Sequence, residues 1–129
     1  MTATLNQPVA AQQAVADLAR GMIAGIEARD PDALACLYAE SAELTLFNRN
    51  HPPGQPMVIR GRAAIRQLYA DILAIDVAHR TEAVVVGDNA FAFEERCQYA
   101  EGGRVAGNCI AQVRDGLIWR QSSVDVWDE

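Results

Sequence analysis

Lysine is missing from this 129-residue sequence, and all eleven basic residues are arginine. The chain therefore has no side-chain amine for Schiff-base chemistry and no lysine for a phosphate-binding P-loop. Its 17 acidic residues outnumber the basic ones, which gives a formal net charge of −6. Because nucleic-acid binding needs a basic surplus that displaces counterions, we expect no nucleic-acid partner.

Cysteine and histidine are scarce, with three and two copies, and none has the spacing of a ligand motif. An odd number of cysteines without a CxxC pair predicts neither a disulfide framework nor a zinc site. We therefore expect a reduced, cytoplasmic protein with no metal and no cofactor. Cys97 and Cys109 should lie on neighbouring strands and pack as small apolar residues, because no histidine is spaced to activate either thiol. His51 and His79 are expected to be surface residues.

Long apolar runs are missing as well. No stretch approaches the roughly eighteen consecutive apolar residues of a membrane span, so no membrane partner is expected. The first residues lack a basic segment followed by an apolar one, so we expect no signal peptide. Half of the residues are hydrophobic, which suits one compact domain over residues 1–129.

The spacing of apolar residues predicts three helices. In the first, from about Pro8 to Ala28, apolar residues recur at steps of three and four, at Val15, Leu18, Met22 and Ile26. The second is short, with Asp30 as its N-terminal cap and Pro31 at its first position. The third covers about residues 61–73 and follows a proline-rich loop at 48–56.

Residues that favour strands occupy the rest of the chain, at 42–48, 79–86, 91–99, 104–114 and 117–127. Glycine-containing turns separate the last four of these segments, which is typical of an antiparallel meander. Helices that precede a run of strands indicate an α+β fold with the helices on one face of a curved sheet.

Four stretches resemble the SnoaL-like branch of the nuclear-transport-factor-2-like (NTF2-like) superfamily: IEARDPDALACLYAESAEL, IRGRAAIRQLYADIL, AFAFEERCQY and RDGLIWRQSSVDVWDE. The resemblance implies a cone-shaped, cystatin-like α+β barrel, in which a strongly curved, mostly antiparallel sheet wraps round three N-terminal helices. It also implies a pocket for a small organic ligand at the wide end, and a homodimer formed through the outer face of the sheet. Members include ketosteroid isomerases, polyketide cyclases, epoxide hydrolases, dehydratases and non-enzymatic binding modules, so the fold alone does not settle the function.

Ketosteroid isomerases, which this chain resembles closely around its helices, use a tyrosine and a protonated carboxylic acid as oxyanion donors and a carboxylate as the base. The matching positions of this sequence hold Met22, approximately Ala111, and Leu46. None of these side chains can donate or accept a proton. We therefore do not expect steroid isomerisation by that mechanism.

The segment FAFEERCQY places a carboxylate on the apolar face of a strand. Phe91, Phe93, Glu95, Cys97 and Tyr99 share one face, because successive side chains of a strand point to opposite sides. A buried carboxylate must find a partner or become neutral. Two interpretations follow: a structural ion pair with an arginine (Arg80, Arg114 or Arg120), or a general acid or base in a pocket.

The last predicted strand supplies a second carboxylate. Gln121, Ser123 and Asp125 alternate along one face between Trp119 and Trp127. The resemblance implies that this face lines the pocket. The alternative is a solvated face or a dimer contact, because one face of an antiparallel sheet is commonly wet.

Together these observations predict a small-molecule-binding protein that performs cofactor-free acid–base chemistry on a mostly apolar substrate, as an isomerase, dehydratase, cyclase or hydrolase. Glu95 and Asp125 form the predicted titrating pair. The residues predicted to contact the substrate are Met22, Tyr38, Leu46, Asn48, Tyr69, Phe93, Cys97, Cys109, Gln121 and Ser123. The alternative is a non-catalytic ligand-binding or protein-interaction module of the same fold.

Overall fold

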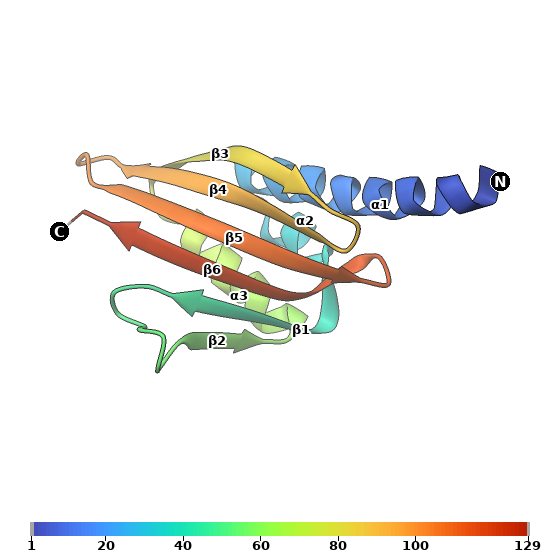
Figure 1. Cartoon of the computed structure of the whole chain (residues 1–129). Coiled ribbons are helices and arrows are strands. Elements are labelled where there is room, and N and C mark those ends of the chain that lie inside the picture. Colours follow the sequence, from blue (N-terminus) through green and yellow to red (C-terminus); the bar gives the residue numbers. More distant parts are fainter. Residues whose placement is uncertain (1, 129) are drawn as a thin grey trace.

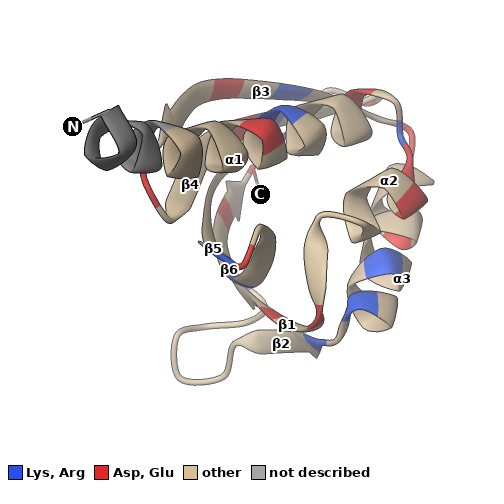
Figure 2. Cartoon of the chain, turned by 90° about the vertical axis from the view of Figure 1, so that its right-hand side faces the viewer, with Lys and Arg blue, Asp and Glu red and all other residues tan. Residues whose placement is uncertain are grey.

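Helices cover one face of a six-stranded sheet in the computed structural model, which describes residues 2–128 and the side chains from residue 10 onward. The elements are α1 (Thr2–Glu27), α2 (Pro31–Ala35), β1 (Tyr38–Phe47), β2 (Met57–Arg60), α3 (Arg62–Leu73), β3 (Val77–Val86), β4 (Ala90–Tyr99), β5 (Arg104–Arg114) and β6 (Leu117–Trp127). All three helices lie on the same side of the sheet (Figures 1 and 2). In residues 2–128, no helix has the length and apolar character that a bilayer span requires.

The strands lie in the order β2-β1-β6-β5-β4-β3. Strands β3 to β6 form the predicted antiparallel meander, and β1 pairs parallel to β6 and antiparallel to β2. This arrangement confirms the predicted α+β class with a mostly antiparallel sheet. The parallel pair brings the last strand of the chain into the middle of the sheet, next to the first strand (Figure 1).

The sequence prediction missed strand β2 and placed four element starts too late, that of β4 by a single residue. Strand β2 has only four residues and directly follows the proline-rich loop, so it shows no clear alternation. Helix α1 begins at Thr2 rather than Pro8, so the helix continues through the proline that was predicted to start it. Strands β1 and β3 begin at Tyr38 and Val77, whereas 42 and 79 were predicted.

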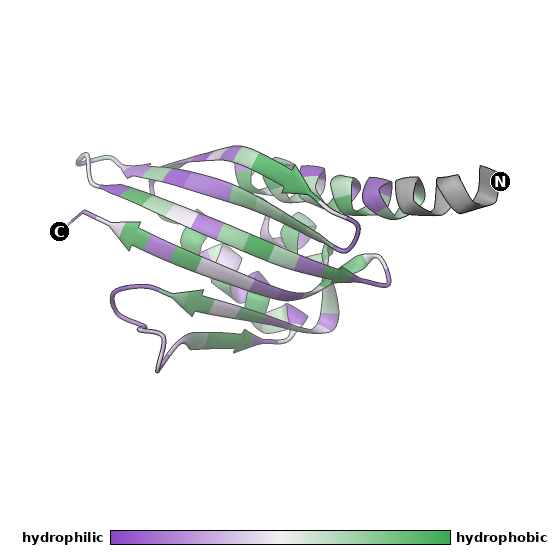
Figure 3. Ribbon diagram, viewed as in Figure 1, coloured by the Kyte–Doolittle hydropathy of each residue, from purple (hydrophilic) through white to green (hydrophobic). Residues whose placement is uncertain are grey.

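The core lies between the helices and the inner face of the sheet. The predicted apolar stripe of α1 is buried, with 0–8% exposure at its four positions, Val15, Leu18, Met22 and Ile26. Phe91 and Phe93 of β4 face it from the sheet, together with Ile118 of β6. The alternation of apolar and polar side chains along the strands is visible in Figure 3.

A capped turn joins α1 to α2. The side chain of Asp30 accepts a hydrogen bond from the backbone N–H of Ala33 at 3.1 Å, as predicted, and satisfies one exposed donor of the short helix. Helix α2 lies so close to α1 that a Cβ atom at Gly25 would be 2.6 Å from the side chain of Leu34. This close approach closes one end of the core.

Candidate functional site

Three strands bring the polar residues of the inner face together. Glu95 on β4 is paired in register with Gly107 on β5, which is in turn paired with Asp125 on β6. His79 on β3 lies opposite Cys97, two residues after Glu95 on the same face of β4. The two predicted catalytic carboxylates therefore point to the same side of the sheet from strands on either side of β5.

Gly107 allows the two carboxylates to approach each other. A Cβ atom at this position would overlap Oδ1 of Asp125, which shows that the Asp125 side chain leans over the glycine. Any larger residue at 107 would occupy the space between Glu95 and Asp125. The glycine in RVAGNCIAQVR is therefore a structural requirement of the site, although its backbone dihedral angles are ordinary.

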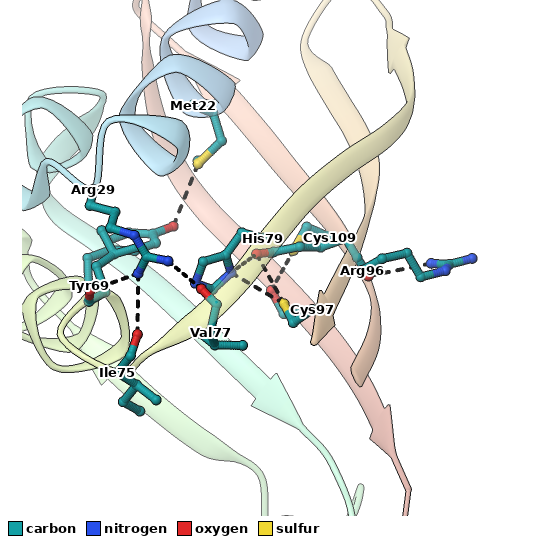
Figure 4. Close-up of polar contacts among 12 residues, drawn as sticks. Met22, Arg29, Tyr69, Ile75, Val77, His79, Arg96, Cys97 and Cys109 are labelled. Carbon is teal, nitrogen blue, oxygen red and sulfur yellow. Dashed lines mark hydrogen bonds and ion pairs between the residues drawn. The ribbon is translucent and has the colours of Figure 1, made fainter. Parts of the chain in front are cut away.

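Glu95 is held by a histidine and a thiol rather than by an arginine. These two partners, His79 and Cys97, lie side by side in Figure 4. Oε1 of Glu95 lies 3.0 Å from Nδ1 of His79 and 3.6 Å from Sγ of Cys97. The prediction of a surface position for His79 is wrong, because its side chain is only 7% exposed. The side chain of Glu95 is 23% exposed. With Glu95 as a carboxylate, Nδ1 carries the ring proton and donates it.

The arginines proposed as partners for Glu95 have other contacts. Arg80 forms an ion pair with Glu82 at 2.6 Å. Arg114 and Arg120 lie over the ring of Trp119, with their Cζ atoms 3.7 and 5.4 Å from its centroid. These contacts are cation–π interactions. The arginine ion-pair interpretation of Glu95 is therefore wrong.

Cys97 lies 3.3 Å from Nδ1 of His79, which the sequence did not predict. Both Glu95 and Cys97 contact the same ring nitrogen, whereas a nucleophile–base–carboxylate triad uses the two nitrogens separately. Burial, followed by the negative charge of Glu95, raises the pKa of Cys97 to about 12. The thiol is therefore protonated near neutral pH and is a poor nucleophile.

The atoms of His79, Glu95 and Cys97 that could ligate a metal lie within 4.8 Å of one another. Imidazole, carboxylate and thiolate are all zinc ligands. A zinc-bound histidine usually donates its second N–H to an acceptor, whereas Nε2 of His79 is buried without a partner in residues 2–128. The high pKa of Cys97 also opposes the loss of the proton that a metal must displace. We therefore assign no metal centre to this cluster.

The surroundings of Asp125 perturb its ionisation. Burial raises its pKa to about 6, and the nearby negative charge of Glu95 contributes in the same direction. No side-chain hydrogen bond or ion pair of Asp125 is found in the described part of the chain. A carboxyl group with this pKa exchanges its proton readily near neutral pH, as a general acid or base must.

Two adjoining hollows meet at this cluster. The outer one has a volume of about 220 Å³ and includes Tyr99, Val105, Gly107 and Trp127 in its wall. The inner one, of about 90 Å³, extends towards Ile26 of α1 and Tyr69 of α3. Both are lined by the same four residues: Ile72, His79, Glu95 and Asp125.

Most residues predicted to contact the substrate line these hollows. Cys97 lines the outer hollow, and the inner one is lined by Leu46, Tyr69, Phe93, Cys109, Gln121 and Ser123. Met22 and Tyr38 are fully buried and line neither hollow. Asn48 lies at a separate hollow with Pro53 and Val124, and its side chain accepts hydrogen bonds from the backbone of its own loop.

A chain of hydroxyl groups reaches the inner hollow from the core. The hydroxyls of Tyr38 and Tyr69 are 2.6 Å apart, and Tyr38 donates to Oε1 of Gln121 at 2.5 Å. Burial raises the pKa of both phenols, so they remain protonated donors. The sequence predicted that both tyrosines contact the substrate, but their pairing depends on the packing of α3 against β1.

A larger and more open hollow, of about 680 Å³, is lined by three arginines, Arg80, Arg96 and Arg104. Each of them has a carboxylate partner, respectively Glu82, Glu94 and Asp128, at 2.6, 2.7 and 3.9 Å. The arginine charges are thus already compensated. Neither Glu95 nor Asp125 lines this hollow, so we place the candidate site at the two smaller hollows, which both carboxylates line.

The helix-covered mixed sheet and the polar cluster facing its helices define an α+β protein of the NTF2-like, cystatin-like class. The sequence matches the SnoaL-like domain family over residues 19–121, and the chain therefore belongs to this family. No match was found among curated proteins.

Solved structures confirm the fold. An NTF2-like protein of unknown function from Mesorhizobium loti has a TM-score of 0.77 and 23% identity, over 92% of this chain and 93% of that one. A candidate ketosteroid isomerase from Kribbella flavida has a TM-score of 0.73 and 22% identity, over 92% and 80% of the two chains. A candidate isomerase from Bacillus subtilis has a TM-score of 0.66 and 22% identity, over 90% and 87%.

Proposed function

We propose that the protein binds a small, mostly apolar molecule in the two adjoining hollows and transforms it by cofactor-free acid–base chemistry. The observation that carries the proposal is the convergence of Glu95 and Asp125 on one cavity across Gly107. Two carboxylates in unlike surroundings are suited to the roles of acid and base. Here Glu95 is fixed by His79, whereas Asp125 has no such partner and titrates near pH 6.

Proton transfer at carbon, and hence isomerisation, is the reaction we favour. Asp125 as a carboxylate would remove a proton from a carbon next to a carbonyl group and return it at another carbon, so that no oxidant or reductant is needed. The amide N–H groups of Gln121, oriented by the bond from Tyr38, could donate to the carbonyl oxygen. Two of the structural neighbours are described as candidate isomerases, which agrees with this choice.

The substrate should be smaller than a steroid. The outer and inner hollows have volumes of about 220 and 90 Å³. Each volume is below the roughly 300 Å³ of the smallest pockets that hold drug-sized ligands. Met22 and Ala111, which occupy two of the ketosteroid isomerase positions, are fully buried, apolar and unable to transfer protons. Both observations favour a compact substrate and a different catalytic pair.

The experiment follows hydrogen–deuterium exchange by proton NMR. A panel of small ketones and β,γ-unsaturated ketones is incubated with the protein in D₂O, and loss of the α-proton signal reports proton abstraction. We expect Asp125→Asn to lower the exchange rate of an accepted compound by about 10²- to 10⁴-fold, the usual contribution of a general base. Glu95→Gln should lower it as well.

Glu94→Gln is the matched control, because Glu94 is adjacent in sequence but lies on the opposite face, paired with Arg96. It should leave the exchange rate unchanged. If compounds that bind show no protein-dependent exchange, the chain is a binding module for them rather than an isomerase. If Asp125→Asn exchanges them at the original rate, Asp125 is not the base.

A further inference from the structure

The cavity at Glu95 and Asp125 is rich in hydrogen-bond acceptors. Its wall contains two carboxylates and the ring of His79. In the neutral tautomer whose Nδ1–H donates to Glu95, Nε2 of His79 presents a lone pair and is also an acceptor. That atom is buried without a hydrogen-bond partner in residues 2–128, in a side chain that is only 7% exposed.

An unpaired buried acceptor costs free energy, and a ligand that donates to it recovers that cost. Asp125 is only partly buried, so it does not pay this full cost, but no side chain of the described residues donates a hydrogen bond to its carboxylate. Two separate observations, the facing carboxylates and the unpaired ring nitrogen, therefore call for donors from the ligand. An apolar ligand without N–H or O–H groups would leave these acceptors unsatisfied.

Positive charge is not supplied by the cavity wall. Among the described residues that line the two hollows there is no arginine, whereas the carboxylates of Glu95 and Asp125 line both. Arg29 reaches this region, as Figure 4 shows, but its guanidinium donates to the backbone carbonyls of Leu73, Ile75 and Val77. The electrostatic potential in the cavity is therefore negative, which favours the binding of a cation.

The remainder of the outer hollow is aromatic and aliphatic. Tyr99 and Trp127 line it together with Ile72, Ile75 and Val105. The faces of aromatic rings carry partial negative charge and attract organic cations within about 6 Å of the ring centre. The aliphatic side chains suit the apolar body of such a molecule.

We infer that the ligand of this cavity is a small apolar molecule that carries a protonated amine. The ammonium group brings N–H donors for the two carboxylates and for Nε2 of His79, and it brings positive charge. Carboxylate and phosphate ligands are excluded by repulsion from Glu95 and Asp125. This inference names the class of molecule that the proposed acid–base site binds. That the amine is a substrate, and not only a ligand, rests on the proposed function.

The test compares three ligands that share a phenyl group and differ in the head group: 2-phenylethylamine, 2-phenylethanol and 3-phenylpropanoate. Thermal shift of the full chain gives the first ranking, because a ligand that binds only the native state raises Tm. Isothermal titration calorimetry then gives Kd. We expect the amine to bind about tenfold or more tightly than the alcohol, and the carboxylate not to bind.

Variants assign the effect to the cavity. Glu95→Gln and Asp125→Asn should each weaken binding of the amine by about tenfold, and should leave binding of the alcohol nearly unchanged. Two variants are used because loss of one carboxylate could alter the packing around His79. Glu94→Gln removes the same charge from the outer face and should not weaken binding, which separates a local effect from the net charge of −6.

Equal binding of the amine and the alcohol overturns the inference but leaves a ligand-binding cavity. Tighter binding of the carboxylate, or no binding of any of the three, also overturns it. A Tm increase with Zn²⁺ alone that is lost in Cys97→Ser, without an increase from the amine, assigns the cation to a metal and rejects the amine. The deuterium-exchange assay gives its answer independently, because its ketones carry no charge.

Discussion

At the scale of single residues, Asp125 has the clearest energetic signature. Its carboxyl group lies in a partly buried position, across Gly107 from another carboxylate, and its pKa is raised from 3.8 to about 6. Between these two values the native state binds more protons than the unfolded state. The free energy of unfolding must therefore fall as the pH rises from about 4 to about 6, and the deficit stays constant above that range.

Asp125→Asn should remove this dependence. We expect the variant to be about 1–2 kcal/mol more stable than the native sequence near pH 8 and about equal to it near pH 4, after an allowance for the partial exposure of the group. Urea unfolding across this pH range measures the difference. Asp88→Asn, in an exposed turn, is the control and should change stability by the same small amount at every pH. A constant difference for Asp125→Asn would show that Asp125 is not perturbed.

At the scale of elements, Arg29 connects the helices to the sheet next to the site. It follows α1 and has a positive φ of 52°, and its guanidinium reaches the turn between α3 and β3. Nη1 donates to the carbonyl oxygens of Leu73 and Ile75 at 3.0 and 3.3 Å, and Nη2 donates to that of Val77. The start of β3, and with it His79, is thereby fixed relative to α1.

Arg29→Lys keeps the charge but loses the two-nitrogen fork that makes these bonds. We expect a loss of about 1–2 kcal/mol in the free energy of unfolding, because several of the carbonyl groups lose a charged donor. Hydrogen exchange by NMR should show faster exchange at the start of β3. The control is Arg20→Lys, since Arg20 forms an exposed ion pair with Asp17 that should contribute little. Equal losses for both variants would contradict the anchoring role.

Local patterns were enough to predict most elements. Strands β5 and β6 have the predicted bounds, because glycine turns delimit them and alternation marks their faces. Strand β2 could not be predicted, since four residues carry too little periodic signal. The parallel pairing of β1 with β6 joins opposite ends of the sequence, and no local pattern encodes it.

The candidate site was predicted only as far as strand alternation allows. Alternation placed Glu95 and Cys97 on one face of β4, and Gln121, Ser123 and Asp125 on one face of β6. The contact of His79 with Glu95 and Cys97 depends on the register of β3 against β4, which a single sequence does not reveal. Gly107 was missed for the same reason. That these residues bind a substrate stays a prediction.

At the scale of the whole molecule, the uncovered face of the sheet is the surface to consider. Ile110, Val124 and Val126 are exposed there by 52%, 52% and 65%, on adjacent strands β5 and β6. The helices lie on the opposite side (Figure 1). Exposed apolar groups that cluster in this way are typical of association surfaces. We propose that this face pairs two copies of the chain, in line with the homodimer expected from the sequence.

Val126→Arg should therefore weaken self-association. An arginine on each copy would place like charges in the contact and disrupt the apolar surface, so the dimer dissociation constant should rise by at least about tenfold. Sedimentation velocity over a range of protein concentrations measures it. Val85→Arg is the matched control, because Val85 is also 65% exposed but lies on the edge strand β3. If the native chain is a monomer at all concentrations, the proposed dimer does not form. If Val85→Arg dissociates the dimer and Val126→Arg does not, the dimer contact lies elsewhere. Neither substitution touches the cavity, so ligand binding should persist in the Val126→Arg monomer if each copy holds a complete site.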